Sequence, residues 1–236
     1  ATEFTELVPD NEATPVDFGD VCVNYDVAAL AAAGVEPPQT LDDLIDPAYR
    51  GMLAVQDPAT SSPGLAFLLG TIAQYGVDGW QQWWEALDAN DVLVTSGWEE
   101  AYNGAFTAAS DTGDRPLVVS YASSPPAEVY FAEVPPTEAP TGSMTEGCFR
   151  QVEFAGILDG TEHEEAARRL VDFMLSEAFQ EDIPLNMFVF PAVEETALPE
   201  VFVEHAARVD APLTLPPADI EANREAWIQQ WTDLMR

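Results

Sequence analysis

The sequence contains no lysine, and arginine supplies all 8 of its basic residues, against 42 acidic ones. The resulting formal net charge of −34 repels nucleic acids and anionic membrane surfaces, so we expect neither as a partner. The same charge would attract small cations by long-range steering, which salt weakens. A surface adapted to salt, or biased codon usage, explains this charge more simply than a ligand does.

Long apolar runs and a leader sequence are also missing. No window holds the roughly 18 consecutive apolar residues that a membrane-spanning helix needs. The chain opens with neither a basic n-region nor an apolar h-region, so we expect a secretory signal to be absent or already removed. Hydrophobic residues make up 47% of the chain and aromatic residues 10%, which is enough for a folded core.

Cysteine is scarce, and each of the two, Cys22 and Cys148, lies in a strand-like segment (DVCVNY and EGCFRQVEF). A disulfide between them would indicate an oxidising compartment. Two buried free thiols are the alternative, and the spacing alone does not exclude it.

Motifs that carry chemistry are missing too. The sequence has no nucleophile elbow, Walker loop or dinucleotide-binding glycine pattern. His163 and His205 have no partner at metal-ligand spacing, and we expect both on solvated helix faces without a metal. Adjacent acids are too common in this chain to identify an acid–base pair. The sequence therefore favours binding over catalysis, and we expect no enzyme.

The sequence does contain alternating strands and helices, which predict an α/β architecture. Residues 1–16 are expected to be extended. The predicted strands are 17–25, 51–56, 92–95, 117–121, 129–134 and 149–158, with a short extended segment at 187–190. The predicted helices are 28–34, 40–45, 63–75, 78–87, 98–108, 162–180 and 218–235. In the helix 78–87, Trp80, Trp83, Trp84 and Leu87 have helical spacing and are predicted to be core.

The stretch QDPATSSPGLAFLLG (56–70) joins a strand to a helix. Ser61 or Ser62 is suited to cap the helix, and Pro63 suits its first turn. The free N–H groups of a helix start can also hold the oxygen atoms of a ligand.

Hydroxyls and aromatic rings also follow two further predicted strands. Trp98 comes after the strand DVLVT, and Tyr121 ends the strand LVVSY. Ligands of open α/β sheets bind beyond the carboxyl ends of the strands. Together with Phe188 in LNMFVFP, these aromatic faces suit a planar or cationic ligand. Each residue taken alone is more simply a cap or a core residue.

The run LDDLIDPAYRGMLAVQDPATSSPGLAFLL resembles the corresponding run of type II solute-binding proteins of ABC importers. Further similar stretches follow in the family's order: VDFGDVCVNYD, TSGWEEAY, LVVSYASSP, EGCFRQVEFAG, DIPLNMFVFPAV and NREAWIQQW. GWEEAY together with SYASSP is typical of the thiamine-binding branch. The resemblance covers nearly all of residues 17–236.

The resemblance implies a periplasmic-binding-protein fold of type II, with two lobes joined by crossover strands. Residues 1–24 would be an opening segment and crossover strand of lobe 1, 25–148 would be lobe 2, and 149–236 a return strand with C-terminal helices of lobe 1. The implied function is to bind thiamine, thiamine monophosphate or thiamine diphosphate, without a cofactor, and to deliver it to a membrane permease.

The resemblance also carries over site residues. The helix start with Ser61, Ser62 and Gly64 matches the residues that hold the hydroxyethyl or phosphate end of thiamine. Phe188 falls where the family often has Trp, which keeps a stacking face but loses an N–H donor. A second family tyrosine falls on Ala127, with Tyr130 as a candidate replacement. The expected ligand-binding residues are Ser61, Ser62, Gly64, Trp98, Tyr121, Phe188 and Asp17.

One departure concerns the start of the chain. Family members open with a β/α section of the first lobe, and this chain begins shortly before the first crossover strand, so we expect the first lobe to be incomplete here. The alignment places Cys22 and Cys148 on crossover or neighbouring strands, which favours the disulfide. We expect a monomer that is periplasmic or extracellular, with a lipid anchor at the cell surface as one option.

Two alternatives remain open. The chain could be a receptor for a polyamine, iron or an organic anion, although ferric receptors of this superfamily commonly use adjacent tyrosines and this chain has no such pair. It could instead be an enzyme of thiamine or pyrimidine metabolism, which would need a nucleophile such as cysteine in the cleft, with Cys148 and Cys22 as the candidates.

Overall fold

The structure is a computed structural model that describes residues 2–8 and 12–235, in which strands and helices alternate as predicted. The strands are β1 (Ala13–Asp26), β2 (Leu53–Gln56), β3 (Leu93–Thr95), β4 (Leu117–Tyr121), β5 (Thr141–Gly156) and β6 (Phe190–Pro191). The α-helices are α1 (Val27–Ala33), α2 (Ser62–Tyr75), α3 (Trp80–Ala89), α4 (Pro125–Tyr130), α5 (Glu164–Met174), α6 (Glu177–Gln180), α7 (Ile183–Met187), α8 (Glu200–His205) and α9 (Pro217–Leu234). Shorter turns are the 3₁₀ helices η1 (Thr2–Leu7), η3 (Asp43–Ile45) and η4 (Pro47–Tyr49), and the π-helix η5 (Glu100–Ala105).

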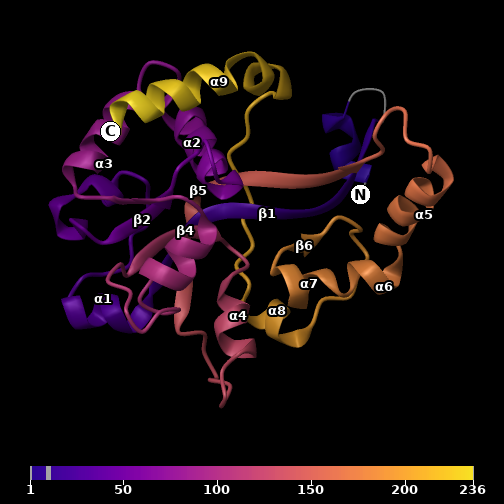
Figure 1. The fold of residues 1–236 in the computed structure, drawn as a ribbon. Helices are drawn as coiled ribbons and strands as arrows, with labels where there is room; N and C mark the ends of the chain where they lie inside the picture. The colour runs from indigo at the N-terminus through magenta and orange to yellow at the C-terminus, as the bar shows by residue number, and fades with distance from the viewer. Residues whose placement is uncertain (1, 9–11, 236) are drawn as a thin grey trace.

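The described strands form one six-stranded sheet in the order β3-β2-β4-β1-β5, with β6 paired to β1. β2 runs parallel to β3 and β4, whereas β1 runs antiparallel to β4 and β5. The β1–β5 pairing extends from Ala13 opposite Gly156 to Asp26 opposite Thr141. These two long strands run from a larger body, which holds β2, β3 and β4, into a smaller body with β6 and α5 to α8 (Figure 1).

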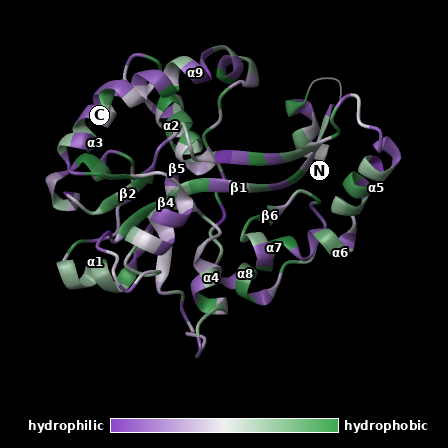
Figure 2. Ribbon diagram, viewed as in Figure 1, coloured by the Kyte–Doolittle hydropathy of each residue, from purple (hydrophilic) through white to green (hydrophobic). Residues whose placement is uncertain are grey.

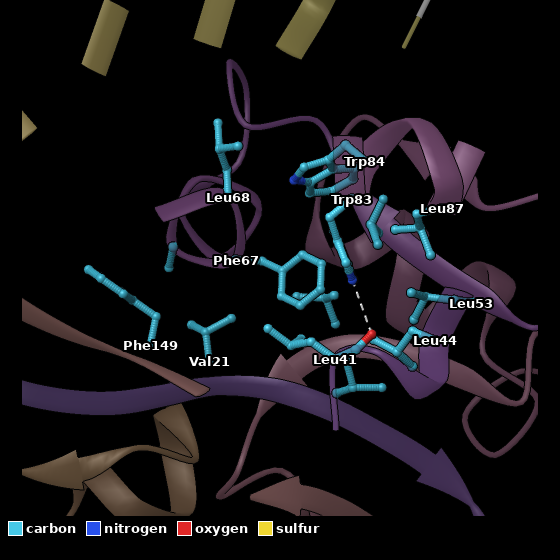
Figure 3. Packing of buried hydrophobic residues seen from close by; sticks show 14 of the residues in the cluster. Val21, Leu41, Leu44, Leu53, Phe67, Leu68, Trp83, Trp84, Leu87 and Phe149 are labelled. Atoms are coloured by element: carbon cyan, nitrogen blue, oxygen red, sulfur yellow. Dashed lines mark hydrogen bonds between the residues drawn. The ribbon is translucent and has the colours of Figure 1, made fainter. Parts of the chain in front are cut away.

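The larger core lies between one face of the sheet and helices α2 and α3. Leu53 and Val55 of β2 point into this core, while Ala54 belongs to the cluster on the opposite face. This alternation is what a strand covered on both faces requires. Figure 3 shows Phe67 of α2 and Trp83 and Trp84 of α3 packed above Leu53 and Leu44.

The predicted tryptophan core is confirmed, because Trp80, Trp83, Trp84 and Leu87 are all buried. The Trp83 indole N–H donates to the Leu41 carbonyl oxygen over 3.2 Å, drawn as the dashed line in Figure 3. Buried indoles need such a partner, since an unpaired N–H in a core is costly. Helix α9 closes this core by placing Trp231 edge-on to Trp84, with ring centroids 5.4 Å apart.

The smaller body packs onto the first half of β1. Its core joins Val16 of β1 to Ile183 of α7 and to Val189. The fully buried Gln180 donates to the Val16 carbonyl oxygen at 2.9 Å and accepts from the backbone N–H of Val193 at 2.9 Å. One amide side chain therefore links α6, β1 and the segment after β6.

The helix predicted for 162–180 is interrupted in the structure. Helix α5 ends at Met174 and α6 begins at Glu177, because Ser176 takes an extended backbone conformation (φ −72°, ψ 152°). The helix was also predicted to be amphipathic, with an apolar face that includes Leu170 and Phe173, but these two residues are 58% and 53% exposed. Figure 2 shows hydrophobic and hydrophilic residues side by side along α5.

β1, β5 and the segment 206–216 connect the two bodies (Figure 1). Cys22 of β1 and Cys148 of β5 form a disulfide, which confirms that prediction. Val209 packs in the same cluster as the two cysteines, and the Leu213 N–H donates to the Cys148 carbonyl oxygen at 2.7 Å. The connecting segments are therefore tied together covalently, by packing and by backbone hydrogen bonds.

Several local predictions were wrong. Residues 129–134 do not form a strand, because α4 occupies Pro125–Tyr130 with prolines in its first turn, where no N–H is needed. The extended segment predicted for 1–16 contains the 3₁₀ helix η1 and the start of β1, and its residues 1 and 9–11 lie outside the described residues. The helix predicted for 98–108 is the shorter π-helix η5.

The division of the chain at 24/25 and 148/149 stays a prediction. Helix α9, which that division groups with 149–236, packs against α3 through Trp231 and Trp84.

Candidate ligand-binding site

The carboxyl ends of the parallel strands β2, β3 and β4 meet at one edge of the sheet, as their registers require. The loops that follow β2 and β3 are joined by hydrogen bonds, and the loop after β3 is joined to β4 by the bond from Trp98 to Ser120. The Asp57 N–H donates to the Thr95 carbonyl oxygen at 2.9 Å, and the Thr60 hydroxyl donates to the Ser96 carbonyl oxygen at 2.7 Å. Residues predicted from three separate strand ends therefore lie on one scaffold.

Helix α2 starts at this edge as the sequence predicts. Ser61 has an extended backbone and its hydroxyl accepts from the Gly64 N–H at 3.4 Å, with Pro63 in the first turn. Gly64 is required by close packing, since a Cβ there would lie 2.6 Å from the Gln56 carbonyl oxygen. Ser61 is buried and Ser62 is exposed, so only the first acts as the cap.

Trp98 is held by hydrogen bonds and by stacking. Its indole N–H donates to the Ser120 hydroxyl at 2.9 Å, and that hydroxyl lies 2.8 Å from the Ser124 hydroxyl. One face of the indole stacks on Tyr102, with centroids 4.8 Å apart and an interplanar angle of 16°. The indole N–H is thus occupied, and Trp98 can offer a ligand only its ring.

Tyr121, at the end of β4, lies against the neighbouring strand β1. Its ring covers Gly19, where a Cβ would come within 2.6 Å of the ring. The Gln151 side-chain N–H donates to the Tyr121 hydroxyl at 3.1 Å. Burial raises the pKa of Tyr121 to about 12, so the phenol is neutral and can donate a proton in a hydrogen bond.

Phe188 approaches from the smaller body in a strained conformation. It ends α7 with φ 52°, in the left-handed region that non-glycine residues rarely adopt. The Ser123 hydroxyl donates to its carbonyl oxygen at 2.7 Å, which links the two bodies beside the site. Such strain costs on the order of 1–3 kcal/mol and concentrates at ligand sites.

The Phe188 ring also contacts Tyr130 and Phe131, with centroids 6.3 and 5.6 Å away. Tyr130 is 49% exposed and Phe131 is 70% exposed, so these two rings form an open apolar rim.

Trp98, Tyr121 and Phe188 line a half-open cavity of about 360 Å³ between the two bodies. This volume falls in the range of small-molecule sites, roughly 300–1,000 Å³. The cavity brings together the predicted Trp98, Tyr121 and Phe188. Its full lining is Pro63, Trp98, Tyr102, Tyr121, Ser124, Ala127, Asn186, Met187 and Phe188.

Other predicted residues lie outside this lining. Pro63 reaches the cavity, but Ser61, Ser62 and Gly64 do not line it. Asp17 lies on β1 and is only 6% exposed. Burial, followed by the charge and hydrogen bond of Glu153, raises the pKa of Asp17 to about 7. The disulfide joins β1 to β5, and its two cysteines also lie outside the cavity lining.

Sequence reasoning missed Tyr102 and Ser124 as lining residues. Tyr102 follows Trp98 by four positions, and residues at that spacing share one side of a helix. Ser124 follows Tyr121 by three positions, and its hydroxyl accepts from the Tyr121 N–H at 3.3 Å. The helical spacing was therefore a usable signal for Tyr102.

No helix within residues 2–8 and 12–235 is long and apolar enough to cross a membrane. In the same residues no group of three or more His, Cys, Asp or Glu side chains is placed to hold a metal ion.

The chain has an α/β fold with two bodies joined by β1, β5 and the segment 206–216, and an aromatic cavity lies between the bodies. This arrangement is that of a ligand-binding protein. Residues 2–210 match the family model described as bacterial extracellular solute-binding protein, and the chain belongs to that family.

Several relatives of this chain are thiamine-binding periplasmic proteins. The one from Salmonella typhimurium is 36% identical over 217 residues, covering 92% of this chain and 62% of the relative. The one from Escherichia coli is 35% identical, with the same coverage. A solved structure described as a periplasmic thiamin binding protein is 31% identical with a TM-score of 0.82, covering 97% of this chain and 68% of that one. The chain thus spans less than two thirds of the length of the relatives from Salmonella typhimurium and Escherichia coli.

Proposed function

We propose that this chain binds thiamine, thiamine monophosphate or thiamine diphosphate as the receptor of an ABC importer. The observation that carries the proposal is the cavity in which Trp98, Tyr121 and Phe188 meet. The names of its relatives from Salmonella typhimurium and Escherichia coli support the same ligand. An ABC permease is the proposed partner, the periplasm the proposed compartment, and a monomer the proposed state.

The chemistry of the cavity suits a flat cation. Thiamine carries a positively charged thiazolium ring joined to an aminopyrimidine ring, and aromatic faces attract such cations. Trp98 and Tyr121 on the larger body and Phe188 on the smaller body would contact the rings from different sides. The chain's charge of −34 would also favour the approach of a cation.

The polar end of the ligand would lie toward the start of α2. Pro63 lines the cavity and belongs to the first turn of this 14-residue helix. The first N–H groups of a helix lack partners within it and attract oxygen atoms or anions. Ser62, exposed at this helix start, is the proposed hydroxyl contact.

The enzyme alternative loses its candidate nucleophiles, because Cys22 and Cys148 are joined in a disulfide and carry no free thiol. The family consists of solute-binding proteins.

Titration of the full chain with thiamine, followed by tryptophan fluorescence and calorimetry, tests the proposal. We expect saturation at micromolar ligand. Trp98→Ala should lower the affinity at least tenfold, because loss of the stacking face removes about 1.4 kcal/mol or more of the binding free energy. Trp80→Phe, deep in the core, is the control for the fluorescence change. No saturable signal with micromolar thiamine would refute the proposal.

The same titration with thiamine monophosphate tests the orientation. Ser61→Ala removes the cap of α2 and should weaken the phosphorylated ligand more than thiamine. Equal losses for both ligands would mean that the N–H groups at the start of α2 do not hold the phosphate, and Ser61 would be a helix cap alone.

A further inference from the structure

Glu128 lies behind the aromatic wall of the cavity, on α4. The Tyr102 hydroxyl donates to its carboxylate oxygen Oε1 at 2.9 Å. Tyr102 lines the cavity and stacks on Trp98 at 4.8 Å. Glu128 does not line the cavity, so it would act on a ligand through Tyr102.

Glu128 has no cationic partner among the described residues. None of the ion pairs there includes it, and the chain has no lysine that could supply one. The other charged group that acts on it is Asp26, whose carboxylate accepts from Thr107 at 2.6 Å and from the Ala29 N–H. A half-buried carboxylate whose nearby charged group is another acid is costly even with a hydrogen bond from Tyr102, and a nearby cation would relieve that cost.

The environment of Glu128 agrees with this cost. Burial raises the pKa of the Glu128 carboxyl, the hydrogen bond from Tyr102 lowers it, and the charge of Asp26 raises it. A bound cation would favour the ionised carboxylate.

We propose that Glu128, acting through Tyr102, makes the cavity select flat aromatic cations over neutral rings of the same shape. A phenol that donates to a carboxylate gains electron density in its ring, which strengthens the attraction between the ring and a cation. The half-buried carboxylate adds its own attraction across the wall, and the buried ring of Tyr102 lies between it and the cavity. Glu128 is thus a residue that sets specificity without touching the ligand. The inference rests on the proposed function for the location of the site.

The test compares three probes by calorimetry on the full chain. They are thiamine, its neutral isostere with thiophene in place of thiazolium, and 1-methylnicotinamide, a smaller flat cation. Glu128→Gln keeps the shape and the acceptor for Tyr102 but removes the charge. We expect it to weaken thiamine binding about tenfold and the neutral isostere less than twofold; the tenfold loss corresponds to about 1.4 kcal/mol.

Glu133→Gln is the matched control. Glu133 is exposed in the loop after α4, so this variant removes one unit of charge without changing the wall. It should leave the ratio of thiamine to isostere affinity unchanged. Thermal unfolding of both variants checks that each is folded. A general loss of structure would weaken the binding of thiamine and of the isostere alike, so it would not change the ratio of their affinities.

Each outcome bears on one of the two proposals. Equal weakening of thiamine and isostere in Glu128→Gln overturns the role of Glu128 and leaves thiamine binding standing. Binding of 1-methylnicotinamide but not thiamine, with a loss of its affinity in Glu128→Gln that Glu133→Gln does not show, overturns the thiamine proposal and supports Glu128. Failure of wild type to bind either cation overturns both.

Discussion

At the residue scale, Asp17 shows how burial and a neighbouring acid act on one carboxyl. Its side chain is almost fully buried, and its Oδ1 atom has no hydrogen-bond partner among the described residues. Burial first, and then Glu153, raises its pKa to about 7. An ordinary aspartate in the unfolded chain titrates near 3.9. The folded state therefore holds a proton on Asp17 at pH values where the unfolded chain has lost it.

This difference gives a predicted dependence of stability on pH. Between about pH 4 and pH 7 the folded state binds more protons at Asp17, so the free energy of unfolding falls as pH rises through this window and changes no further above it. Asp17→Asn should remove this fall and stabilise the protein at pH 8 by about 1–3 kcal/mol, with little effect at pH 4. Urea unfolding of wild type and variant at both pH values measures the difference.

Asp159→Asn, at an exposed position, is the control for the loss of one charge. If the free energy of unfolding changes with pH in the same way in wild type and in Asp17→Asn, the assignment of the pH dependence to Asp17 is wrong.

At the element scale, the position of α2 decides where the site can form. Its first turn presses on β2, since the Gly64 Cα faces the Gln56 carbonyl at a distance that leaves no room for a methyl group. The same turn carries Ser61 as the cap and Pro63 as part of the cavity wall. The contact that packs α2 on the sheet therefore also fixes the position of Pro63 in the cavity wall.

Gly64→Ala tests this requirement. The added Cβ would meet the Gln56 carbonyl oxygen at 2.6 Å, so α2 must shift, and we expect a loss of about 1–3 kcal/mol in the free energy of unfolding. Thermal and urea unfolding measure it. Gly104→Ala has open space around its Cβ and is the matched control. A variant as stable as the control would show that α2 is not held by this contact.

At the scale of the whole molecule, the crossing segments decide how the two bodies are held. Cys22 and Cys148 are separated by 126 residues and joined in a disulfide. Arg150 of β5 donates to both carboxylate oxygens of the buried Asp20 on β1, at 2.8 Å each. Such a bidentate pair fixes geometry as well as adding energy. The crossing region is thus constrained by a covalent bond and an ion pair on neighbouring strands.

Reduction of the disulfide should lower the free energy of unfolding by about 2–5 kcal/mol, because it frees a long loop in the unfolded chain. Urea unfolding with and without dithiothreitol measures the change. The double variant Cys22→Ser with Cys148→Ser should be less stable and insensitive to dithiothreitol. A dithiothreitol effect that persists in this variant would mean that the reagent acts elsewhere.

Patterns along the chain were sufficient to predict features that depend on interactions between residues close together in the sequence. The α/β alternation, the start of α2 at Ser61 and the buried tryptophans of α3 follow from periodicity and capping, because each depends on neighbours within a few residues. The strand predicted at 129–134 failed because an apolar run of that length fits either a strand or a helix, and the prolines of α4 favoured the helix.

The ligand cavity required information from residues far apart in the sequence. Trp98, Tyr121 and Phe188 come from three segments, and only the folding of the two bodies around β1 and β5 brings their rings together. The same holds for the pairing of Glu128 with Tyr102, which no spacing rule predicts. The stretch QDPATSSPG (56–64) could be recognised as a helix start capped by serine from the sequence alone, since a cap is local. Its Pro63 became part of a site wall only because the sheet and the smaller body supply the opposite side.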